Sequence, residues 1–476
     1  MEKYDLIVIG SGPGGEKAAV KAAYFKHKVA LIERSPQVGG TPVYEGIPAK
    51  VLKEMAMHLS GKIEDNIYGY SGDHYHFKTA ELFFNRAHQL SSQYSIEVKE
   101  NLQQHTVDVY YGEASFVDPH CIHILGQREL TIYGDHIIIA AGTDPIRCGK
   151  EGTMVDGKRI HNTKTILEIT RIPKSLCICG MGISGCEHAS VFALLKTKIF
   201  FINRNKTILK AFDSEIIHFF LEKLEEEGVE IIYDEVEKIE IPKSDDEDLK
   251  VSLKSGDIFH VEMVLFSAGR LGNTKNLNLE NAGVISNDKG IIPCNEHYQT
   301  NVSHIYAVGD VNGIVPLANV AMDQGRHAVA QIFKNDALQT QEIIPFGMYT
   351  SPEIAAVGLK EDEVKALKID YVVGYSYYSD ITRGKLVGSE GMMKILFSKN
   401  EMEVLGVHIV GPSATELIHF GVGLVREKNT MMFIINQLFN FPTLHELYKY
   451  AAFDGLSCLT GYKMKKGRAN CHASID

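Results

Sequence analysis

The chain opens with an apolar run, a glycine-rich turn and a helical pattern. Residues 4–9 read Tyr-Asp-Leu-Ile-Val-Ile. A short continuous run of this kind predicts a buried parallel strand. We expect a helix to follow up to about Lys26 and a second strand over Lys28–Glu33. Strand, helix and strand in this order form one βαβ unit.

The same pattern returns in the middle of the chain. Ser175–Cys179 predicts a strand, followed by a glycine-rich turn, a helix to about Leu195 and a strand over Lys198–Ile202. Two similar units at large separation indicate two nucleotide sites. A helix over residues 213–228 and alternating segments at 229–241, 249–254 and 258–266 complete this region.

The remaining segments divide into three stretches. The pattern is helical from about residue 48 to 104, and it is β-rich from about 105 to 139, before the sequence Ala140-Ala141-Gly142-Thr143. After about residue 340 it mixes strands and helices and lacks a glycine-rich phosphate loop. We therefore predict an α/β protein with two Rossmann-like units and an α+β C-terminal region.

Composition and charge narrow the classes of partner. A chain of 476 residues predicts about three domains. The net charge of −11 disfavours nucleic acid, which needs clustered Lys and Arg. We expect no membrane association and a cytoplasmic location, because neither a span of ~20 apolar residues nor a signal peptide is found. The acidic run over residues 244–248 is interpreted as a solvated hairpin turn, with a docking patch as the alternative.

Cysteines are scattered rather than paired. No CxxC pair or repeated metal-ligand spacing occurs, so no metal site is expected. Cys177 and Cys179 alternate within an apolar strand, which predicts buried thiols on one face. The eight cysteines are Cys121, Cys148, Cys177, Cys179, Cys186, Cys294, Cys458 and Cys471.

The first glycine-rich turn, GSGPGG over residues 10–15, fits G-x-G-x-x-G between a strand and a helix. Gly10 permits the tight turn, Gly12 lets the backbone approach a pyrophosphate, and Gly15 allows close packing. Unpaired N–H groups at the helix N-terminus favour the anion. Glu33 ends the next strand, where a carboxylate accepts hydrogen bonds from ribose hydroxyls.

The second turn, GMGISG over residues 180–185, supplies Gly180, Gly182 and Gly185. The following strand ends at Asn203 and Arg204, where no acid stands. A carboxylate there would repel the 2′-phosphate of NADP, whereas these residues tolerate or attract it. The sequence thus favours NADP acceptance, with solvated loop charges as the alternative reading.

A third feature is the strand that ends in Gly309-Asp310, before a helix that begins near Leu317-Ala318. The carboxylate of Asp310 can accept a hydrogen bond from a sugar-alcohol hydroxyl, and N–H groups of the following helix can lie near a phosphate.

In this order the motifs resemble the flavin-dependent pyridine nucleotide–disulfide oxidoreductases. The resemblance covers nearly the whole chain, through GSGPGG, AAGT at 140–143, the second turn, SAGR at 267–270 and AVGD at 307–310. It implies a glutathione reductase-like fold and a homodimer or larger homo-oligomer. Its implied domains are FAD-binding over 1–150 and 276–343, NAD(P)-binding over 151–275 and dimerisation over 344–476.

The reactive segment departs from that family. Disulfide reductases carry a C-x4-C pair just before Ile-Pro-Ser-Lys, whereas here Pro42 takes the first cysteine's place and the segment is one residue shorter. Thiol–disulfide exchange requires a thiolate, so it is excluded at this position. Phe439 and Phe441 likewise replace the family's acid/base histidine before Pro-Thr, while Glu446 remains and His445 is displaced along the chain with an open role.

Loss of both groups indicates a different reaction, and the chain resembles the soluble pyridine nucleotide transhydrogenase branch of this family. GMGISGCE at 180–187, RLGNT at 270–274, DQGR at 323–326 and FNFPT at 439–443 carry this similarity. It implies hydride transfer between NADPH and NAD through bound FAD, with these nicotinamide nucleotides as partners. The shortened segment 41–47 differs from this branch too, and its effect on activity stays open.

By the same resemblance, Lys50 and Glu187 are the expected catalytic residues. The lysine would approach the flavin N5 atom, pair with the glutamate and stabilise the reduced flavin by its positive charge. The other cofactor-binding residues that the resemblance implies are Gly14, Gly40, Thr41, Ala114, Ala141, Gly142, Gly269, Arg270, Gly309, Asp310, Leu317 and Ala318.

Three alternatives remain open at this point. An NAD(P)H oxidase or diaphorase would pass electrons to oxygen or quinones, and the shortened segment would favour it by exposing the flavin. A dihydrolipoamide dehydrogenase-like protein would lack disulfide reductase activity. A nucleotide-binding regulatory protein would keep the fold without catalysis, against which Lys50, Glu187 and both glycine-rich turns argue.

Overall fold

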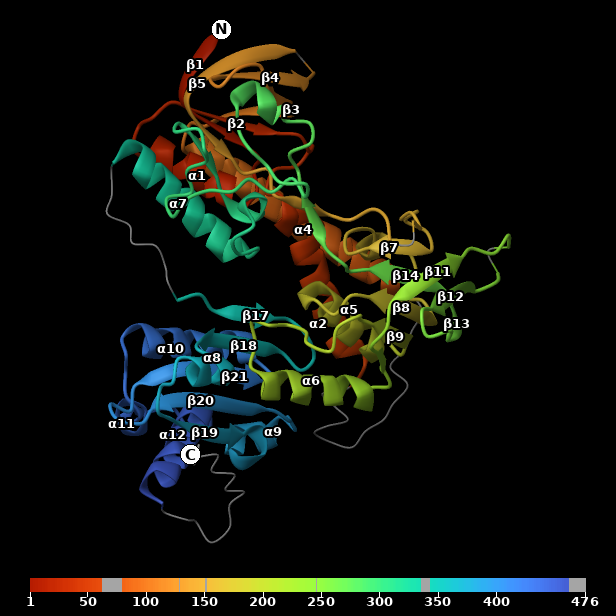
Figure 1. Cartoon of the computed structure of the whole chain (residues 1–476), viewed down its shortest axis with the longest axis vertical. Coiled ribbons are helices and arrows are strands. Elements are labelled where there is room, and N and C mark those ends of the chain that lie inside the picture. The colour runs from red at the N-terminus through yellow and green to blue at the C-terminus, as the bar shows by residue number, and fades with distance from the viewer. Residues whose placement is uncertain (62–78, 128, 150–151, 245, 335–342, 462–476) are drawn as a thin grey trace.

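The computed structural model describes residues 1–61, 79–127, 129–149, 152–244, 246–334 and 343–461. Figure 1 shows the N-terminal part (red to orange) at one end, the C-terminal part (blue) at the other, and the middle of the chain (yellow to green) beside them. Helix α7 (Ala318–Phe333) returns to the N-terminal part and packs against α1 (Pro13–Tyr24). The N-terminal part is therefore built from two separate stretches of chain.

The N-terminal sheet has six strands. Its central strand β1 pairs in parallel with β2 and β5, and β16 pairs in parallel with β5. Leu6, Ile7 and Val8 are fully buried, as expected for a strand covered on both faces. The strands are β1 (Glu2–Ile9), β2 (Val29–Glu33), β3 (Asp108–Phe116), β4 (Cys121–Gly126), β5 (Leu130–Ile139) and β16 (Ile305–Ala307).

The middle part repeats this arrangement with a five-stranded parallel sheet. The residues of helix α5 (Ile183–Leu194) are nearly all apolar or small, and the helix is therefore buried along most of its length. The sheet strands are β7 (Ile160–Asn162), β8 (Ser175–Cys179), β9 (Lys198–Ile202), β10 (Glu230–Ile232) and β14 (Met263–Phe266), with the helical segments η2 (Thr165–Glu168) and α6 (Ser214–Glu226).

An antiparallel three-stranded sheet adjoins the middle part, formed by β11 (Val236–Glu240), β12 (Leu249–Leu253) and β13 (Ile258–Val261). The acidic run connects β11 to β12, and Asp246, Glu247 and Asp248 are exposed. The prediction of a solvated hairpin turn is confirmed for these three residues, while Asp245 lies outside the described residues.

Two short strands join the N-terminal and middle parts. Strand β6 (Thr143–Pro145) leaves the first sheet, β15 (Arg270–Gly272) returns to it, and the two pair antiparallel. The chain then continues through the 3-10 segments η3 (Leu279–Ala282) and η4 (Gly309–Asn312). The middle part is thus an insertion into the first.

Beyond β2, the described residues of the predicted helical stretch form two helices. A π-helical turn, η1 (Pro42–Gly46), leads directly into α2 (Ile47–Leu59), and α4 (Thr79–Gln104) packs beside α2. Residues 62–78 of the prediction lie outside the described residues. Helix α2 also packs on α5, so it contacts both the first and the middle part.

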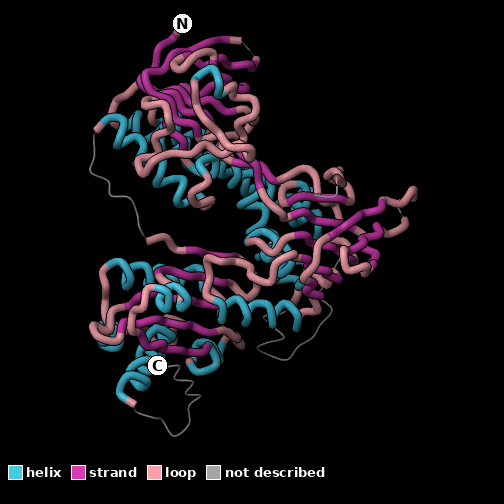
Figure 2. Tube along the Cα trace, in the orientation of Figure 1, coloured by secondary structure: helices cyan, strands magenta, loops and turns pink. Residues whose placement is uncertain are grey.

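The C-terminal part is an antiparallel five-stranded sheet, and Figure 2 shows helices around it. Its strands are β17 (Phe346–Met348), β18 (Ile354–Gly358), β19 (Tyr371–Tyr377), β20 (Met392–Ser398) and β21 (Val404–Val410). Its helical segments are α8 (Glu361–Ala366), η5 (Tyr378–Asp380), α9 (Thr382–Leu386), α10 (Ala414–Arg426), α11 (Met431–Asn436) and α12 (Glu446–Thr460).

Across the described part of the chain, every helix is too short or too polar to cross a membrane.

Candidate functional site

The first glycine-rich turn lies between β1 and α1, where the sequence predicts it. A Cβ on Gly15 would stand 1.9 Å from the carbonyl oxygen of Gly10, so the helix can approach the strand only with glycine here. Around Gly12 the nearest atom to such a Cβ is Gly40 Cα at 4.0 Å. The turn therefore leaves space over Gly12 at the N-terminus of α1, where unpaired N–H groups attract anions.

Glu33 is held in place beside this turn. It is 6% exposed, and its Oε2 atom accepts hydrogen bonds from the Ser11 backbone N–H at 3.0 Å and the Ser11 hydroxyl at 2.5 Å. Its Oε1 atom accepts one from the Ser35 N–H at 2.8 Å. Each carboxylate oxygen keeps a lone pair for a further donor. A ribose hydroxyl is a donor of the kind that fits.

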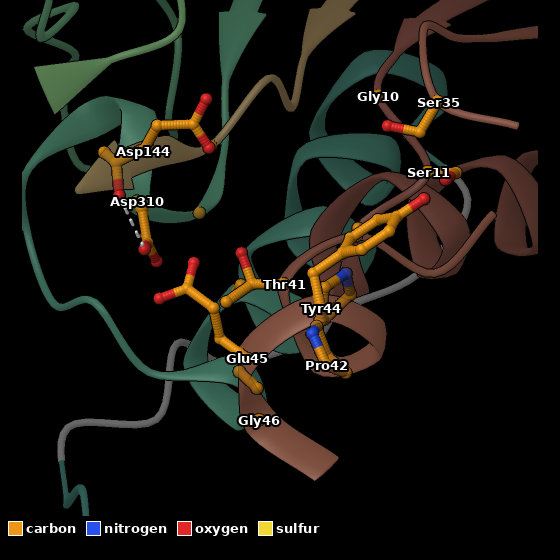
Figure 3. Close-up of a pocket in the computed structure, with 18 of the residues that line it drawn as sticks. Gly10, Ser11, Ser35, Thr41, Pro42, Tyr44, Glu45, Gly46, Asp144 and Asp310 are labelled. Atoms are coloured by element: carbon orange, nitrogen blue, oxygen red, sulfur yellow. Dashed lines mark hydrogen bonds between the residues drawn. The ribbon is translucent and has the colours of Figure 1, made fainter. Parts of the chain in front are cut away.

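A cavity of about 870 Å³ extends from this turn to the start of α2. That volume lies in the range of cofactor and ligand sites. In Figure 3, the carboxylates of Glu45 and Asp310 point toward one another on one side of it. The predicted residues that line it are Gly10, Gly12, Gly14, Glu33, Gly40, Thr41, Lys50, Ala114, Ala141, Gly142, Gly309, Asp310 and Ala318.

Other predicted residues lie outside this lining. Gly15 packs behind the turn, Gly269 accepts from the Ile146 N–H at 3.2 Å, and Leu317 is the residue that precedes α7, without a side-chain hydrogen bond to the helix N-terminus. Arg270 points its guanidinium at Glu45 and Thr143. Glu187 and the residues of the second turn belong to the middle part of the chain.

Lys50 and Glu187 come together as the resemblance implies. The ammonium of Lys50, on α2, donates to both carboxylate oxygens of Glu187, on α5, at 2.8 and 3.0 Å. The Tyr349 backbone N–H also donates to Glu187 at 3.0 Å, and the Lys50 Nζ atom lies 4.7 Å from the centroid of the Tyr349 ring. With the Glu187 side chain 11% exposed and that of Lys50 39% exposed, the pair is anchored on one side and open to the cavity on the other.

Thiols are absent from the cavity lining within the described residues. The turn η1 instead places Pro42, Tyr44 and Glu45 at its wall. Cys177 and Cys179 are buried on one face of β8 with their sulfur atoms 3.8 Å apart, as the alternation predicts. Cys471 falls outside the described residues. The site as described has no sulfur relay.

Asp310 lies in η4, just after β16, and its side chain contacts Thr143 of β6. Its Oδ2 atom accepts a hydrogen bond from the Thr143 hydroxyl at 3.1 Å. Burial raises the pKa of the Asp310 carboxyl above its usual value, and the positive charge of Arg270 opposes this effect. The carboxyl therefore needs hydrogen-bond donors, which the hydroxyl groups of a bound sugar alcohol would provide.

The second glycine-rich turn lies between β8 and α5, apart from the cavity. A Cβ on Gly182 would meet no atom within 4 Å, whereas one on Gly185 would stand 2.0 Å from the Gly180 carbonyl oxygen. The Asn203 amide accepts from the Met181 N–H at 3.3 Å and donates to the Asn205 carbonyl at 2.6 Å. Arg204 is exposed next to it. The turn thus repeats the open and the close-packed glycine of the first turn.

His445 lies in the C-terminal part, among aromatic side chains. Its ring centroid is 6.1 Å from that of Phe439 and 6.4 Å from those of Phe420 and Tyr448. Burial lowers the pKa of the imidazole, so the neutral form is favoured. Within the described chain His445 packs as an aromatic residue, away from the cavity lining.

Several residues of the site were not predicted. Thr143 and Asn273 lie within the AAGT and RLGNT motifs without being singled out there, and Tyr349 lies in none of the motifs. Glu45 had one signal, since it is a carboxylate in the segment that takes the dithiol's place.

Comparisons with known proteins identify the family and the fold. The family profile described as "Pyridine nucleotide-disulphide oxidoreductase" matches residues 4–325, and the profile for its dimerisation domain matches residues 344–452. Two solved structures share the fold. They are the HOCl-induced flavoprotein disulfide reductase RclA from Escherichia coli (TM-score 0.84, 23% identity, 94% of this chain and 99% of that chain) and LpdA from Mycobacterium tuberculosis (TM-score 0.86, 21% identity, 95% and 99%).

Curated relatives named soluble pyridine nucleotide transhydrogenase are more similar in sequence. The relative from Mycobacterium tuberculosis (strain ATCC 25177 / H37Ra) is 36% identical over 464 residues, covering 95% of this chain and 97% of its own. Those from Hahella chejuensis and Azotobacter vinelandii are 35% and 36% identical, each covering 96% of this chain and 98% and 99% of their own. The chain therefore belongs to the pyridine nucleotide-disulphide oxidoreductase family.

Proposed function

We propose that this protein transfers a hydride between NADPH and NAD by way of a bound FAD. The observation that carries the proposal is the Lys50–Glu187 pair at the edge of a cavity whose described lining contains no thiol. The relatives' name supports the same reaction. A disulfide reductase would need a thiolate at η1, where Pro42 and Glu45 stand instead.

The cavity residues fit FAD. We assign the pyrophosphate to the open space over Gly12 at the N-terminus of α1, the adenosine ribose to Glu33 and the sugar alcohol to Asp310. FAD supplies the ring that can accept a hydride and give it up again. The protein's share is to bind, orient and exclude water.

Lys50 and Glu187 supply a fixed charge at the reacting end of the cavity. A preorganised ammonium favours negative charge that develops beside it, and in a partly buried site this effect is larger than in water. Glu187 holds the ammonium in one place through two hydrogen bonds of 2.8 and 3.0 Å. Alignment of the two reactants lowers the barrier further, by roughly 7–11 kcal/mol in favourable cases.

The two substrates can be followed by anaerobic stopped-flow absorbance of the flavin. We expect NADPH to bleach the flavin band and subsequent NAD to restore it, without any thiol added. Recovery on admitting air but not with NAD would identify an oxidase or diaphorase. A protein that stays colourless with added FAD would identify a non-catalytic relative, and either result contradicts the proposal.

We propose that Asn203 and Arg204 allow the second turn to accept NADP. Asn203→Asp keeps the acceptor for the Met181 N–H but places a carboxylate where the 2′-phosphate would lie. We expect the ratio of kcat/KM for NADPH to that for NADH to fall about tenfold or more, corresponding to about 1.4 kcal/mol.

Asn301→Asp is the matched control for this change. The Asn301 amide also accepts from a backbone N–H, at 3.0 Å, and donates to a carbonyl, at 2.7 Å. It lies in the second of the two stretches that build the N-terminal part, away from the second turn. It should leave the nucleotide ratio unchanged. A wild-type enzyme that strongly prefers NADH would contradict the assignment of Asn203.

We also infer that the protein is a homodimer joined through its C-terminal domain, proposed over 344–476. That part exposes Leu438 to 95%, Phe441 to 73% and Phe453 to 43%. Apolar side chains gathered on one domain favour a protein partner over solvent. Sedimentation equilibrium measures the mass directly, and a monomer at micromolar concentration would contradict the inference.

A further inference from the structure

The turn η1 contacts the inserted part of the chain through Glu45. Arg270 donates from Nη1 to Glu45 Oε2 at 2.8 Å and from Nη2 to Oε1 at 3.1 Å. The Thr163 hydroxyl donates to Oε2 at 3.2 Å. The Glu45 side chain is 13% exposed. A bidentate pair of this kind fixes direction as well as distance, because the planar guanidinium matches the carboxylate.

Arg270 is itself fixed from its other edge. Its Nε atom donates to the Thr143 hydroxyl at 2.8 Å, and Nη2 donates to the Thr143 carbonyl at 2.7 Å. The same hydroxyl donates to Asp310. A continuous set of hydrogen bonds therefore runs from η1 through β15 and β6 to η4.

A second contact from η1 reaches the same region. The ammonium of Lys164 lies 4.9 Å from the centroid of the Tyr44 ring, within the range of a cation–π interaction. Lys164 follows Thr163 directly in the chain, so neighbouring residues of η1 contact neighbouring residues of the inserted part. Two side chains of η1, those of Tyr44 and Glu45, therefore contact the inserted part.

Helix α2 and its preceding turn are thus joined to the inserted part at two points of opposite polarity. Glu45 presents a negative charge to Arg270, and Lys50 presents a positive charge to Glu187. The Glu45 pair lies on the turn that precedes α2, and the Lys50 pair lies in the first turn of α2 itself. Contacts at both places fix the orientation of α2 against the second nucleotide unit.

We propose that Glu45 is a positioning residue for hydride transfer, holding the nicotinamide-binding part at a set distance from the flavin cavity. This inference rests on the function proposed above. Reaction rates depend steeply on such alignment, and a misplacement of 1 Å can cost ~10²-fold. Glu45 has this positioning role in the segment where disulfide reductases carry their thiols.

Two substitutions separate position from charge. Glu45→Ala removes both the charge and the oxygen atoms, whereas Glu45→Gln removes the charge but keeps one acceptor for Arg270. In the FAD-loaded dimer, we expect Glu45→Ala to slow flavin reduction at saturating NADPH by about tenfold, with KM within about twofold. Glu45→Gln should lose less than about threefold. A purely electrostatic role would change both variants equally, which would overturn the proposal.

A second readout does not depend on turnover. Hydrogen exchange of backbone amides in residues 163–168 and 270–272 should rise by about tenfold in Glu45→Ala, because that substitution releases them from η1. Thr163→Val removes a single hydrogen bond and should give a smaller rise in the same peptides. It also keeps the test possible should Glu45→Ala fail to fold.

Glu240→Ala is the matched control. Glu240 accepts from the Lys250 ammonium at 3.0 Å on the β11–β12 hairpin and does not line the cavity. The variant therefore loses an ion pair of the inserted part without a change at the cavity. It should leave the rate and both exchange regions as in the wild type. Unchanged rate and exchange in Glu45→Ala would overturn the proposal. A wild type that nicotinamides cannot reduce would refute the proposed function alone, and the exchange result would still decide whether Glu45 holds the two parts together.

Discussion

Lys50→Met slows reduction of the flavin by NADPH about 10²-fold, while FAD content stays near that of the wild type. The expected size is that of removing one preorganised group from a transition state, ~10²–10³-fold. Methionine keeps much of the side-chain volume but cannot donate to Glu187, which then keeps only the Tyr349 N–H among the two donors described. The measurement is single-turnover stopped-flow at saturating NADPH, so that weaker binding does not enter the rate.

Lys53→Met is the control for this prediction. Lys53 lies three residues further along α2 and is also paired, with Glu54 at 2.9 Å and Glu353 at 3.0 Å, but it is not part of the cavity lining. We expect it to lower the melting temperature and leave the single-turnover rate within about twofold. A Lys50→Met enzyme that reduces its flavin at the wild-type rate would remove Lys50 from the site.

The second large effect concerns stability. Lys394→Met lowers the free energy of unfolding by about 3–5 kcal/mol, the cost of leaving buried charges without their partner. The Lys394 side chain, in β20, is 0% exposed. Its ammonium lies 3.0 Å from Asp213, which caps α6 of the middle part, and 2.5 Å from Glu361 of the C-terminal part. The substitution leaves three carboxylates, those of Asp213, Glu361 and Glu215 (at 3.4 Å), without the cation between them.

Acid should remove the same stabilisation from the wild type. Burial opposes ionisation of Glu361, but hydrogen bonds from Lys365 and Lys394 outweigh it and lower the pKa of the carboxyl to about 2. Burial also opposes ionisation of Asp213, but the charge of Lys394 outweighs it and lowers the pKa of that carboxyl. A carboxyl with a lowered folded-state pKa stabilises fully above its unfolded value, ~4.3, and progressively less as pH falls toward about 2.

Thermal unfolding by calorimetry between pH 7 and 3 tests both the effect of Lys394→Met and the effect of acid on stability. The melting temperature of the wild type should decrease once the pH is lowered past about 4.5. The melting temperature of Lys394→Met should already be lower at pH 7 and should depend less on pH. Lys365→Met is the control, because Lys365 also contacts Glu361, at 2.8 Å, but is 59% exposed. It should cost under ~1 kcal/mol. Equal melting temperatures for wild type and Lys394→Met would contradict the assigned role.

The sequence predicts the fold well where the signals are local. Both βαβ units follow from short apolar runs and glycines within a few residues of one another, because a turn and the start of a helix depend on neighbouring residues. Pairing of Lys50 with Glu187 could be expected from the resemblance but not from the residues themselves, which are 137 positions apart. The same limit applies to Glu45 and Arg270, separated by 225 positions.

Lys394 illustrates a different limit. A lysine inside the apolar run Met392–Ser398 indicates a buried charge that must have a partner. Its partners Asp213 and Glu361 lie 181 and 33 positions away, on other elements. Local periodicity identifies the need for a counter-charge and leaves its identity to the tertiary structure.

The pairing of β6 with β15 has a consequence for how such a protein can be altered. Because Thr143 and Gly272 are opposite one another in the ladder, the two ends of the inserted unit lie only about 5 Å apart. An inserted unit whose two ends are adjacent can be removed or exchanged without distorting the part into which it is inserted, since the gap is the width of one residue pair. Recombination at these two strands would thus graft a foreign nucleotide module onto an intact flavin scaffold.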